Sequence, residues 1–264
     1  MSRSGAFGGV SLRARHVWRR DVEVALRTWW TAFLPPILEP VLYLLAFGAG
    51  MGSLVGTVAW NGREIGYTTF FAPGLIAISI FFWAFFETLY SSFIRMYYQR
   101  TYDAIVATPL SLEDVITGEI LWGATKSVFV SAVMLAVISA FGVLHFPEAL
   151  LVLPFALLSG VLYASFGMIF TAICPTIDTF NLPIFCLAYP MFLFSGTFFP
   201  TDVLPGWARA LAHILPVTHT ANFARSVCLG QVSAALWGEV LYTAAVGAVL
   251  YVVALVLMRR RLVK

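Results

Sequence analysis

The side chains that could do chemistry in this sequence are few, and two of them are carboxylates inside long apolar runs. Glu39 lies between Pro36 and Pro40, and Glu87 lies in the run Phe-Phe-Glu-Thr-Leu-Tyr. A charge at the centre of a bilayer costs on the order of 2.5–3.5 kcal/mol on insertion scales, so each carboxylate should face protein or water. We interpret Glu39 as structural, whereas Glu87 could equally line a substrate path or take part in packing.

Histidine, cysteine and serine residues do not form a catalytic or metal-binding pattern. His213 and His219 are six residues apart, separated by a proline and without an acidic neighbour, so we predict no metal site. The three cysteines fall at different expected depths, which indicates no disulfide. Ser195 lacks the glycine that a rhomboid-like protease has two residues earlier, because Leu193 stands there. No catalytic residue is predicted.

The elements that must position these residues are membrane-spanning helices. The chain has 264 residues, of which 60% are hydrophobic and 11% charged, whereas about 25% of the residues of a soluble domain are charged. Its apolar stretches approach or exceed the roughly 20 residues of a span, and they lie at about 34–54, 70–94, 120–144, 149–173, 180–199 and 233–258. Residues 1–264 are therefore expected to form a single all-α integral membrane domain of six spans.

Residues 12–30 predict an amphipathic helix that lies in the membrane interface, the alternative being a solvated helix that caps the protein. Its apolar face would hold Trp18, Val22, Leu26 and Trp29, and its charged i, i+4 ladder would hold Arg19, Glu23 and Arg27. With both termini in the cytoplasm, all but three of the 16 Lys and Arg residues lie in inner segments. The positive-inside rule favours this orientation.

The sizeable inner loop, residues 95–119, predicts two short helices. Pro109 disfavours helix at Thr108, where the first helix should end. Ser111, followed by Asp114 three residues later, predicts a capping box that opens the second. The loop is either an ordinary polar connector or a rigid knob for a cytoplasmic partner. Three of its side chains would be displayed toward the cytoplasm, namely Arg100, Tyr102 and Asp103.

The segment 194–207 cannot continue a straight helix, because prolines and glycines crowd together in it. Irregular backbone beside a span must be shielded by protein or lie near water. We predict a re-entrant or interfacial outer hairpin between the fifth and sixth spans, and its marker residues are Gly196, Pro200, Pro205 and Trp207.

Aromatic residues concentrate in the second and fifth apolar stretches. Such residues more often face lipid or pack than line a channel, although aromatic faces can also stack on sugar rings. The candidates for a substrate path are Phe82, Phe85, Glu87, Tyr189 and Phe192.

The loop and the hairpin together resemble the permeases of type-2 ABC exporters. The loop contributes Gln-Arg-Thr-Tyr-Asp-Ala at 99–104 and Thr-Pro-Leu-Ser at 108–111. The hairpin contributes Phe-Leu-Phe-Ser-Gly-Thr-Phe-Phe-Pro at 192–200 and Leu-Pro-Val-Thr-His at 215–219. With the six-span layout the resemblance covers nearly the whole chain, and it is strongest to the nodulation-protein-J type, which exports lipo-oligosaccharides.

The resemblance implies a homodimer in the bacterial inner membrane, in contact with lipid, with two copies of a separate ATPase that binds ATP and Mg. This chain would bind no cofactor and would not be an enzyme; it has no G-x-x-x-x-G-K-[ST] run to cradle phosphates. The residues implied to couple to the ATPase are Arg100, Thr101, Tyr102, Asp103 and Pro109. A multidrug or polysaccharide exporter, and an ion-coupled secondary transporter using Glu87, remain alternatives. No nucleic-acid partner is expected, because the basic residues flank spans and form no single face.

Overall fold

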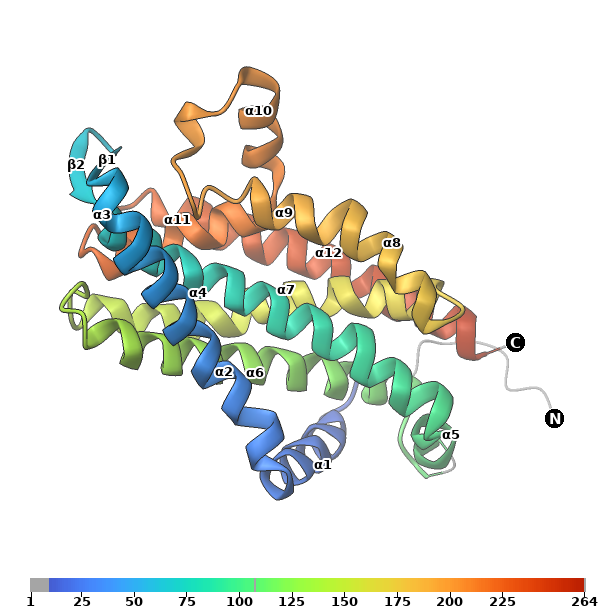
Figure 1. Ribbon diagram of the computed structural model, residues 1–264. Helices are drawn as coiled ribbons and strands as arrows, with labels where there is room; N and C mark the ends of the chain where they lie inside the picture. Colours follow the sequence, from blue (N-terminus) through green and yellow to red (C-terminus); the bar gives the residue numbers. More distant parts are fainter. Residues whose placement is uncertain (1–9, 107, 264) are drawn as a thin grey trace.

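Long helices that run side by side make up the computed structural model, which describes residues 10–106 and 108–263 (Figure 1). Within this part of the chain, four helices are long and apolar enough to span a membrane, at Tyr67–Tyr98, Leu112–Ser139, Glu148–Ile173 and Leu236–Leu262. The predicted first and fifth spans contain shorter apolar helices, Val41–Val55 and Ile177–Leu193. The lengths of these helices support the all-α membrane fold. They account for four membrane crossings and not for the six that we predicted.

The first half of the chain alternates regular helix with short π-helical stretches. Its elements are α1 (Ala14–Arg27), α2 (Trp29–Tyr43), η1 (Leu44–Met51), α3 (Gly52–Val55), β1 (Thr57–Trp60), β2 (Arg63–Gly66), α4 (Tyr67–Phe86), η2 (Glu87–Ser91), η3 (Ile94–Tyr98), α5 (Thr101–Val106) and α6 (Leu112–Ser139).

The second half has two long helices separated by shorter pieces. Its elements are η4 (Glu148–Leu151), α7 (Val152–Ile173), η5 (Ile177–Phe180), α8 (Asn181–Pro183), η6 (Ile184–Ala188), α9 (Tyr189–Leu193), η7 (Thr201–Val203), α10 (Gly206–Ile214), α11 (Pro216–Cys228) and α12 (Leu236–Leu262).

Helix α4 forms the centre of the bundle. Every residue from 70 to 81 is buried, as expected for a helix that is apolar all round. It packs against α6, α7 and α11. The crossing with α7 is close at Gly167, where a Cβ would lie 2.3 Å from Thr88 Oγ1 and 2.4 Å from the Phe85 carbonyl oxygen. Glycine is therefore required at that crossing.

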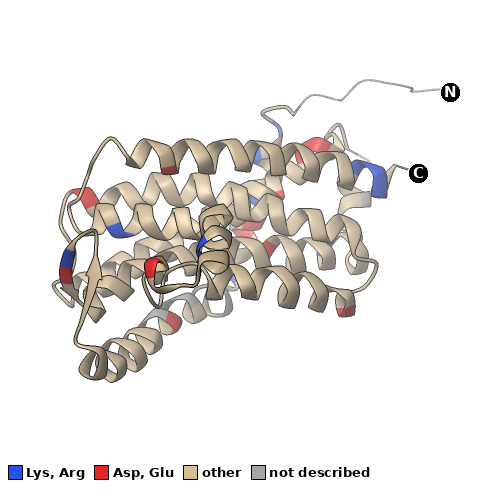
Figure 2. Cartoon of the chain, turned by 90° about the horizontal axis from the view of Figure 1, so that it is seen from above, with Lys and Arg blue, Asp and Glu red and all other residues tan. Residues whose placement is uncertain are grey.

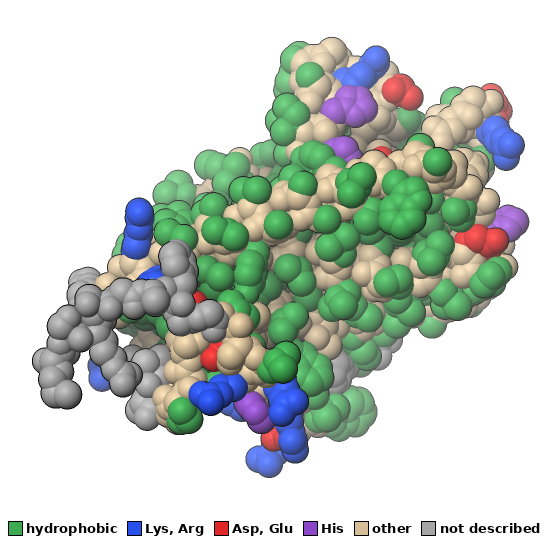
Figure 3. All heavy atoms as spheres, turned by 180° about the vertical axis from the view of Figure 1, so that it is seen from behind, with side chains coloured by type: hydrophobic (Ala, Val, Ile, Leu, Met, Phe, Trp, Pro, Cys, Tyr) green, Lys and Arg blue, Asp and Glu red, His purple; other side chains and the backbone are tan. Residues whose placement is uncertain are grey.

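Charged residues lie at both ends of the bundle and also at several places along it (Figure 2). Hydrophobic side chains cover the middle of the surface seen in Figure 3, and the charged side chains gather toward its edges. An apolar middle between polar ends is the surface that a bilayer requires of a protein that spans it.

One end of the bundle, here called the α5 end, brings together segments far apart in the sequence. The Ser11 amide donates to Asp114 Oδ1 (2.7 Å), which ties the start of α1 to the start of α6. Arg261 donates to the Thr171 carbonyl (2.7 Å), which ties the end of α12 to α7. The predicted capping box is confirmed, because the Ser111 hydroxyl accepts from the Asp114 amide while the Asp114 side chain accepts from the Ser111 amide.

The N-terminal helix is shorter than predicted, and the face that it packs against the protein is not its predicted apolar face. It ends at Arg27, and the side chains that pack against the protein are Ala14, Val17, Asp21 and Ala25. Leu26 and Trp29, which we expected on the apolar face, are exposed. The side of α1 that faces the protein carries short side chains, because α6 approaches it closely at Gly118. A Cβ at Gly118 would lie 2.6 Å from Val17 Cβ.

The opposite end carries a β-hairpin that the sequence analysis missed. Strands β1 and β2 pair antiparallel, with Thr57 opposite Gly66 and Trp60 opposite Arg63. The connecting Asn61 and Gly62 both have positive φ, at 48° and 73°. An Asn-Gly turn is the strongest short hairpin signal, and it was overlooked here because the flanking strands are only four residues long.

The segment predicted to form the outer hairpin leads into two helices, α10 and α11, which lie differently against the bundle. After α9 ends at Leu193, the chain bends through residues 194–200 with Gly196 at φ 72°. Helix α10 stands away from the bundle, whereas α11 returns and lies along it (Figure 1). Helix α11 packs against α4 and α12, and Pro216 is its first residue.

Candidate functional site

The predicted coupling residues lie on and beside the short helix α5, which connects the central helix to α6. Arg100 precedes α5 with φ at 48°, a left-handed conformation that costs a non-glycine residue about 1–2 kcal/mol. Thr101 begins the helix, and Pro109 follows it in an exposed turn. The Pro109 carbonyl accepts a hydrogen bond from the Arg13 guanidinium (2.7 Å). The side chain of Asp103 lies outside the part of the chain that the structure describes.

Tyr102 does not face outward, so our expectation that it is displayed was wrong. Its side chain is 1% exposed and belongs to the core formed by the central helices. Burial, together with the nearby Glu119 carboxylate, raises the Tyr102 pKa well above its usual range. A helix of six residues is not stable in isolation. The buried Tyr102 ring therefore anchors α5 to the core.

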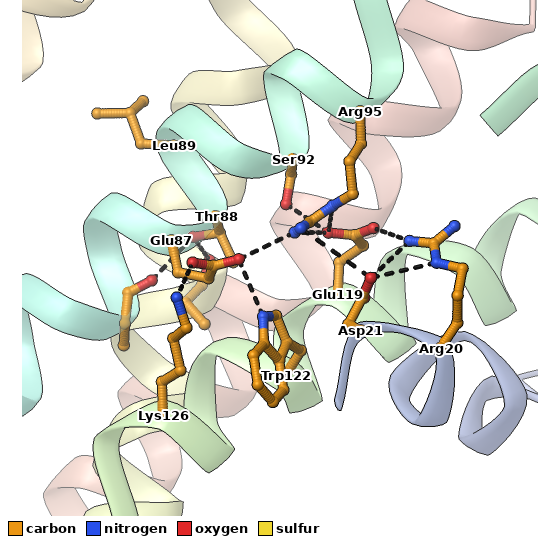
Figure 4. A network of polar contacts seen from close by, with 12 residues as sticks. Arg20, Asp21, Glu87, Thr88, Leu89, Ser92, Arg95, Glu119, Trp122 and Lys126 are labelled. Carbon is orange, nitrogen blue, oxygen red and sulfur yellow. Dashed lines mark hydrogen bonds and ion pairs between the residues drawn. The ribbon is translucent and has the colours of Figure 1, made fainter. Parts of the chain in front are cut away.

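Next to this anchor lies a cluster of buried charges, shown in Figure 4, whose first part surrounds Glu87. Lys126 Nζ donates to Glu87 Oε2 (2.6 Å), and Trp122 Nε1 donates to Glu87 Oε1 (3.0 Å). The Arg95 guanidinium donates to the same Oε1 (3.1 Å). Glu87 is thus buried with two cations and an indole, and it starts the π-helical segment η2. Lys126, which we counted among the basic residues of inner segments, lies within α6.

The second part of the cluster surrounds Glu119, whose side chain is fully buried. Arg95 Nε and the Ser92 hydroxyl each donate to Glu119 Oε2 (both 2.8 Å). Arg20 donates to Glu119 Oε1 (3.2 Å) and to Asp21 Oδ1 (2.7 Å). Arg95 therefore bridges the two parts, and Arg20 and Asp21 bring α1 into the network.

The cluster balances its charges and joins three elements at one place (Figure 4). A small polar cavity of about 250 Å³ adjoins it between α1, η2 and α6. Buried charges are tolerated when paired and hydrogen-bonded, but removal of one partner is costly. The cations are Arg20, Arg95 and Lys126, and the carboxylates are Asp21, Glu87 and Glu119.

The candidate substrate-path residues separate into two groups. Phe85 is fully buried and packs between the rings of Phe81 and Phe166, so it lies in the core. Phe82 and Phe192 are half-buried with ring centroids 5.4 Å apart. Tyr189 is 42% exposed and has its ring 6.5 Å from that of Phe192. These last three form an aromatic strip between α4 and α9, while Glu87 belongs to the charge cluster.

The comparisons with known proteins identify the family. A profile described as ABC-2 type transporter matches residues 13–229. Nodulation protein J of Rhizobium leguminosarum bv. viciae is 35% identical over 257 residues, which cover 97% of each chain. The chain belongs to the ABC-2 type transporter family. Nodulation protein J of the biovar trifolii is 36% identical over 226 residues, covering 86% of this chain and 85% of the relative. Inner membrane transport permease YadH of Escherichia coli (strain K12) is 25% identical over 217 residues, which cover 82% of each.

The remaining predicted positions of this ABC-2 transporter permease lie away from the charge cluster. Glu39 of α2 accepts a hydrogen bond from Trp83 Nε1 (3.0 Å). Gly196 is buried, Pro200 and Pro205 flank η7, and Trp207 of α10 is 68% exposed. Helices α10 and α11 thus begin where the prolines predict a break, and Trp207 projects from the segment that stands off the bundle.

The sequence analysis of this permease missed most of the charge cluster. Arg95 and Glu119 were placed in the loop because each lies near the edge of an apolar stretch, although both belong to long helices. A usable signal was the spacing of Glu87, Ser92 and Arg95 within one helical run. The partner of Glu119 on α1, Arg20, could not be found from spacing, since it comes from a separate helix about a hundred residues away.

Proposed function

We propose that this chain is the membrane-spanning permease subunit of an ATP-driven exporter that moves a lipo-oligosaccharide or another amphipathic glycolipid across the bacterial inner membrane. In this proposal six spans cross the membrane, both termini lie in the cytoplasm, and two copies assemble with two copies of a separate P-loop ATPase. The resemblance to the nodulation-protein-J type of exporter motivates the substrate class, and the absence of a P-loop motif from the sequence supports a separate ATPase.

The observation that carries the coupling role is the anchoring of α5. The buried ring of Tyr102 fixes this short helix beside the charge cluster, and the cluster joins α1, the run after α4, and α6. A displacement of α5 by an ATPase would therefore move three elements at once. A flexible loop attached only at its ends would change its own conformation instead and would not transmit the displacement.

The aromatic strip of Phe82, Tyr189 and Phe192 supports an amphipathic substrate. Its rings are partly exposed along the apolar middle of the bundle. Aromatic faces offer contacts to both acyl chains and sugar rings. A multidrug or polysaccharide exporter would use the same arrangement, so the strip supports an amphipathic cargo more strongly than one particular glycan.

The ion-coupled alternative assigns Glu87 as a proton carrier. A carrier must bind and release a proton in each cycle, whereas Glu87 accepts hydrogen bonds from Lys126, Arg95 and Trp122, which favour its ionised form. In Glu87→Gln, a secondary transporter would lose transport driven by a proton gradient, while an ATP-driven exporter would keep transport that depends on ATP.

The test is ATP hydrolysis by the permease co-expressed with its neighbouring ATPase and purified in lipid nanodiscs. Arg100→Ala/Asp103→Ala should leave the complex assembled but weaken or uncouple hydrolysis. Arg19→Ala/Glu23→Ala removes an exposed ion pair on α1 and serves as the matched control. If no ATPase co-purifies and none is stimulated, the ABC mechanism is wrong for this chain.

Arg100→Gly separates the two possible contributions of that residue. Glycine adopts positive φ freely, so this variant keeps the backbone turn and removes only the guanidinium. If Arg100→Gly and Arg100→Ala uncouple hydrolysis equally, the guanidinium carries the effect. If the two variants differ, relief of the left-handed strain, which alanine retains as arginine does and glycine removes, contributes to coupling as well.

A further inference from the structure

A polar cavity lies at the end of the bundle opposite α5, under the protruding helix α10. Its volume is about 470 Å³, within the range of roughly 300–1,000 Å³ found for small-molecule sites. The β1–β2 hairpin, α10 and α11 surround it (Figure 1). It is separate from the aromatic strip and from the charge cluster, whose residues do not line it.

The residue that distinguishes this cavity is Arg225 of α11. Its side chain is 2% exposed, yet it lines the cavity. Its Nε donates to the Phe70 carbonyl and one terminal nitrogen donates to the Gly196 carbonyl, both at 3.0 Å. The guanidinium carbon lies 3.9 Å from the centre of the Phe70 ring. These contacts hold the guanidinium plane in one orientation.

No carboxylate of the described chain forms an ion pair with Arg225. Two backbone carbonyls use two of its N–H donors, and a guanidinium has five. A buried cation without a counter-charge is costly. Of the two carboxylates that line the cavity, Glu239 is engaged by His219, and Asp202 is exposed at the rim. An anionic group entering the cavity would find an oriented fork of donors.

The rest of the lining fits a sugar more closely than a bare anion. The half-buried indole of Trp60 provides a flat apolar face. The amides of Asn61, Asn222 and Gln231 can both donate and accept, as sugar hydroxyls require. A bare anion would use the guanidinium and leave these amides without a partner.

We propose that this cavity binds a saccharide that carries an acidic substituent, with Arg225 receiving the anionic group and the amides and Trp60 holding the ring. The inference deepens the proposed export function, on which it rests, by adding a recognition site for an acidic sugar at the end away from the ATPase. Arginine suits this role because its planar fork matches a carboxylate or sulfate with two parallel hydrogen bonds.

The test compares three probes on the full chain in nanodiscs without any ATPase: glucuronate, glucose and acetate. Binding is measured by calorimetry and by the shift of the thermal unfolding midpoint. We expect glucuronate to bind at least about tenfold more tightly than either other probe. Equal binding of glucose would overturn the anion recognition, and equal binding of acetate would overturn the sugar recognition. No binding of glucuronate would overturn the site, whatever the export assay shows.

Two variants locate the binding. Arg225→Lys keeps the charge but loses the planar fork, so the preference for glucuronate should fall about tenfold. That variant also disturbs the two carbonyl contacts and could unfold the protein. Asn222→Ala avoids this problem, because Asn222 lines the cavity without bonding to the described protein. It should weaken glucuronate severalfold at an unchanged unfolding midpoint in the absence of sugar, and unchanged affinity would remove Asn222 from the site.

Discussion

At the scale of single residues, the part of this permease beside α5 depends on buried charges that neighbouring side chains neutralise. Arg95 is the residue that joins the two parts of the cluster, since it contacts both Glu87 and Glu119. Its side chain is 16% exposed, so water contributes little to its solvation. The contribution of Arg95 to stability is therefore best measured by replacing it, which leaves the buried Glu87 and Glu119 carboxylates with fewer cationic partners.

Arg95→Gln should destabilise the protein by about 3–5 kcal/mol, because Glu119 keeps only Arg20 as a cationic partner. The free energy of unfolding in mixed micelles is the measurement. Arg19→Gln is the control, because its partner Glu23 and Arg19 itself are mostly exposed and such a pair contributes about 0–1 kcal/mol. Similar losses in the two variants would mean that the buried cluster is not a stabilising unit.

His219 makes the end of the bundle opposite α5 sensitive to pH. Its Nε2 donates to the His213 carbonyl (2.9 Å) and its Nδ1 faces Glu239. Both contacts are hydrogen bonds only when the ring carries two protons. Burial lowers the His219 pKa, but the bonds to Glu239 and to the carbonyl outweigh it and raise the pKa above 6.5. The stabilisation is complete below 6.5 and is lost as pH rises through the raised pKa.

The thermal unfolding midpoint should therefore fall as pH rises from 6.5 through the raised pKa of His219. His219→Gln should remove most of this dependence. His213→Gln should keep it, because the contact comes from the backbone carbonyl of His213. A pH profile that is identical in the wild type and in His219→Gln would assign the titration to another group.

At the scale of elements, the sequence predicts best what local chemistry decides. The capping box at Ser111 follows from two side chains three residues apart, and the break after Leu193 follows from the glycines and prolines that come next. Leu26 and Trp29 of the predicted apolar face of α1 are exposed, as a face turned to the membrane would be, whereas the face that packs against α6 was not predicted. In a membrane protein, large apolar side chains can face lipid, and small residues face neighbouring helices.

The same distinction explains why the candidate site was only partly predicted. Glu87 was identified because a carboxylate in an apolar run is conspicuous, whereas its partner Lys126 was counted only among the basic residues of inner segments. Helix spacing cannot show that α1 returns to cover α6, so Asp21 and Arg20 carried no signal. The cluster forms only when α1 packs on α6 and on the helical run after α4, and no local sequence pattern predicts that packing.

The docking of α1 on α6 can be tested through a glycine. A Cβ on Gly118 would lie 2.6 Å from Val17 Cβ and 2.9 Å from the Ala14 carbonyl oxygen. Gly118→Ala should therefore cost about 1–3 kcal/mol through overpacking, and it should speed tryptic cleavage at the α1 arginines. Gly238→Ala is the matched control in α12, because nothing lies within 4 Å of the added methyl group. Equal behaviour of the two variants would show that α1 does not pack there.

At the scale of the whole molecule, the apolar side surface is larger on some helices than on others. Helix α12 buries only 17% of its most apolar window, and the helix from Ile177 to Leu193 exposes several large apolar side chains. Exposed apolar surface inside a bilayer can contact lipid at no cost, so exposure alone does not identify a subunit interface. The aromatic strip is a more specific candidate for an interface. Its rings lie next to one another, so they could stack on a second copy or on a substrate.

Cys186 offers a direct test of the proposed homodimer. It lies in η6, on the same short helix as Tyr189, and it is exposed, whereas Cys174 and Cys228 are buried. If two copies meet along the aromatic strip, a short bis-maleimide should join them through Cys186 in native membranes, and Cys186→Ser should abolish the product. The buried cysteines act as internal controls, because they should not react in the folded protein. A dimer detected by mass photometry that is not cross-linked through Cys186 would place the interface on another face, and the aromatic strip would then face lipid or substrate alone.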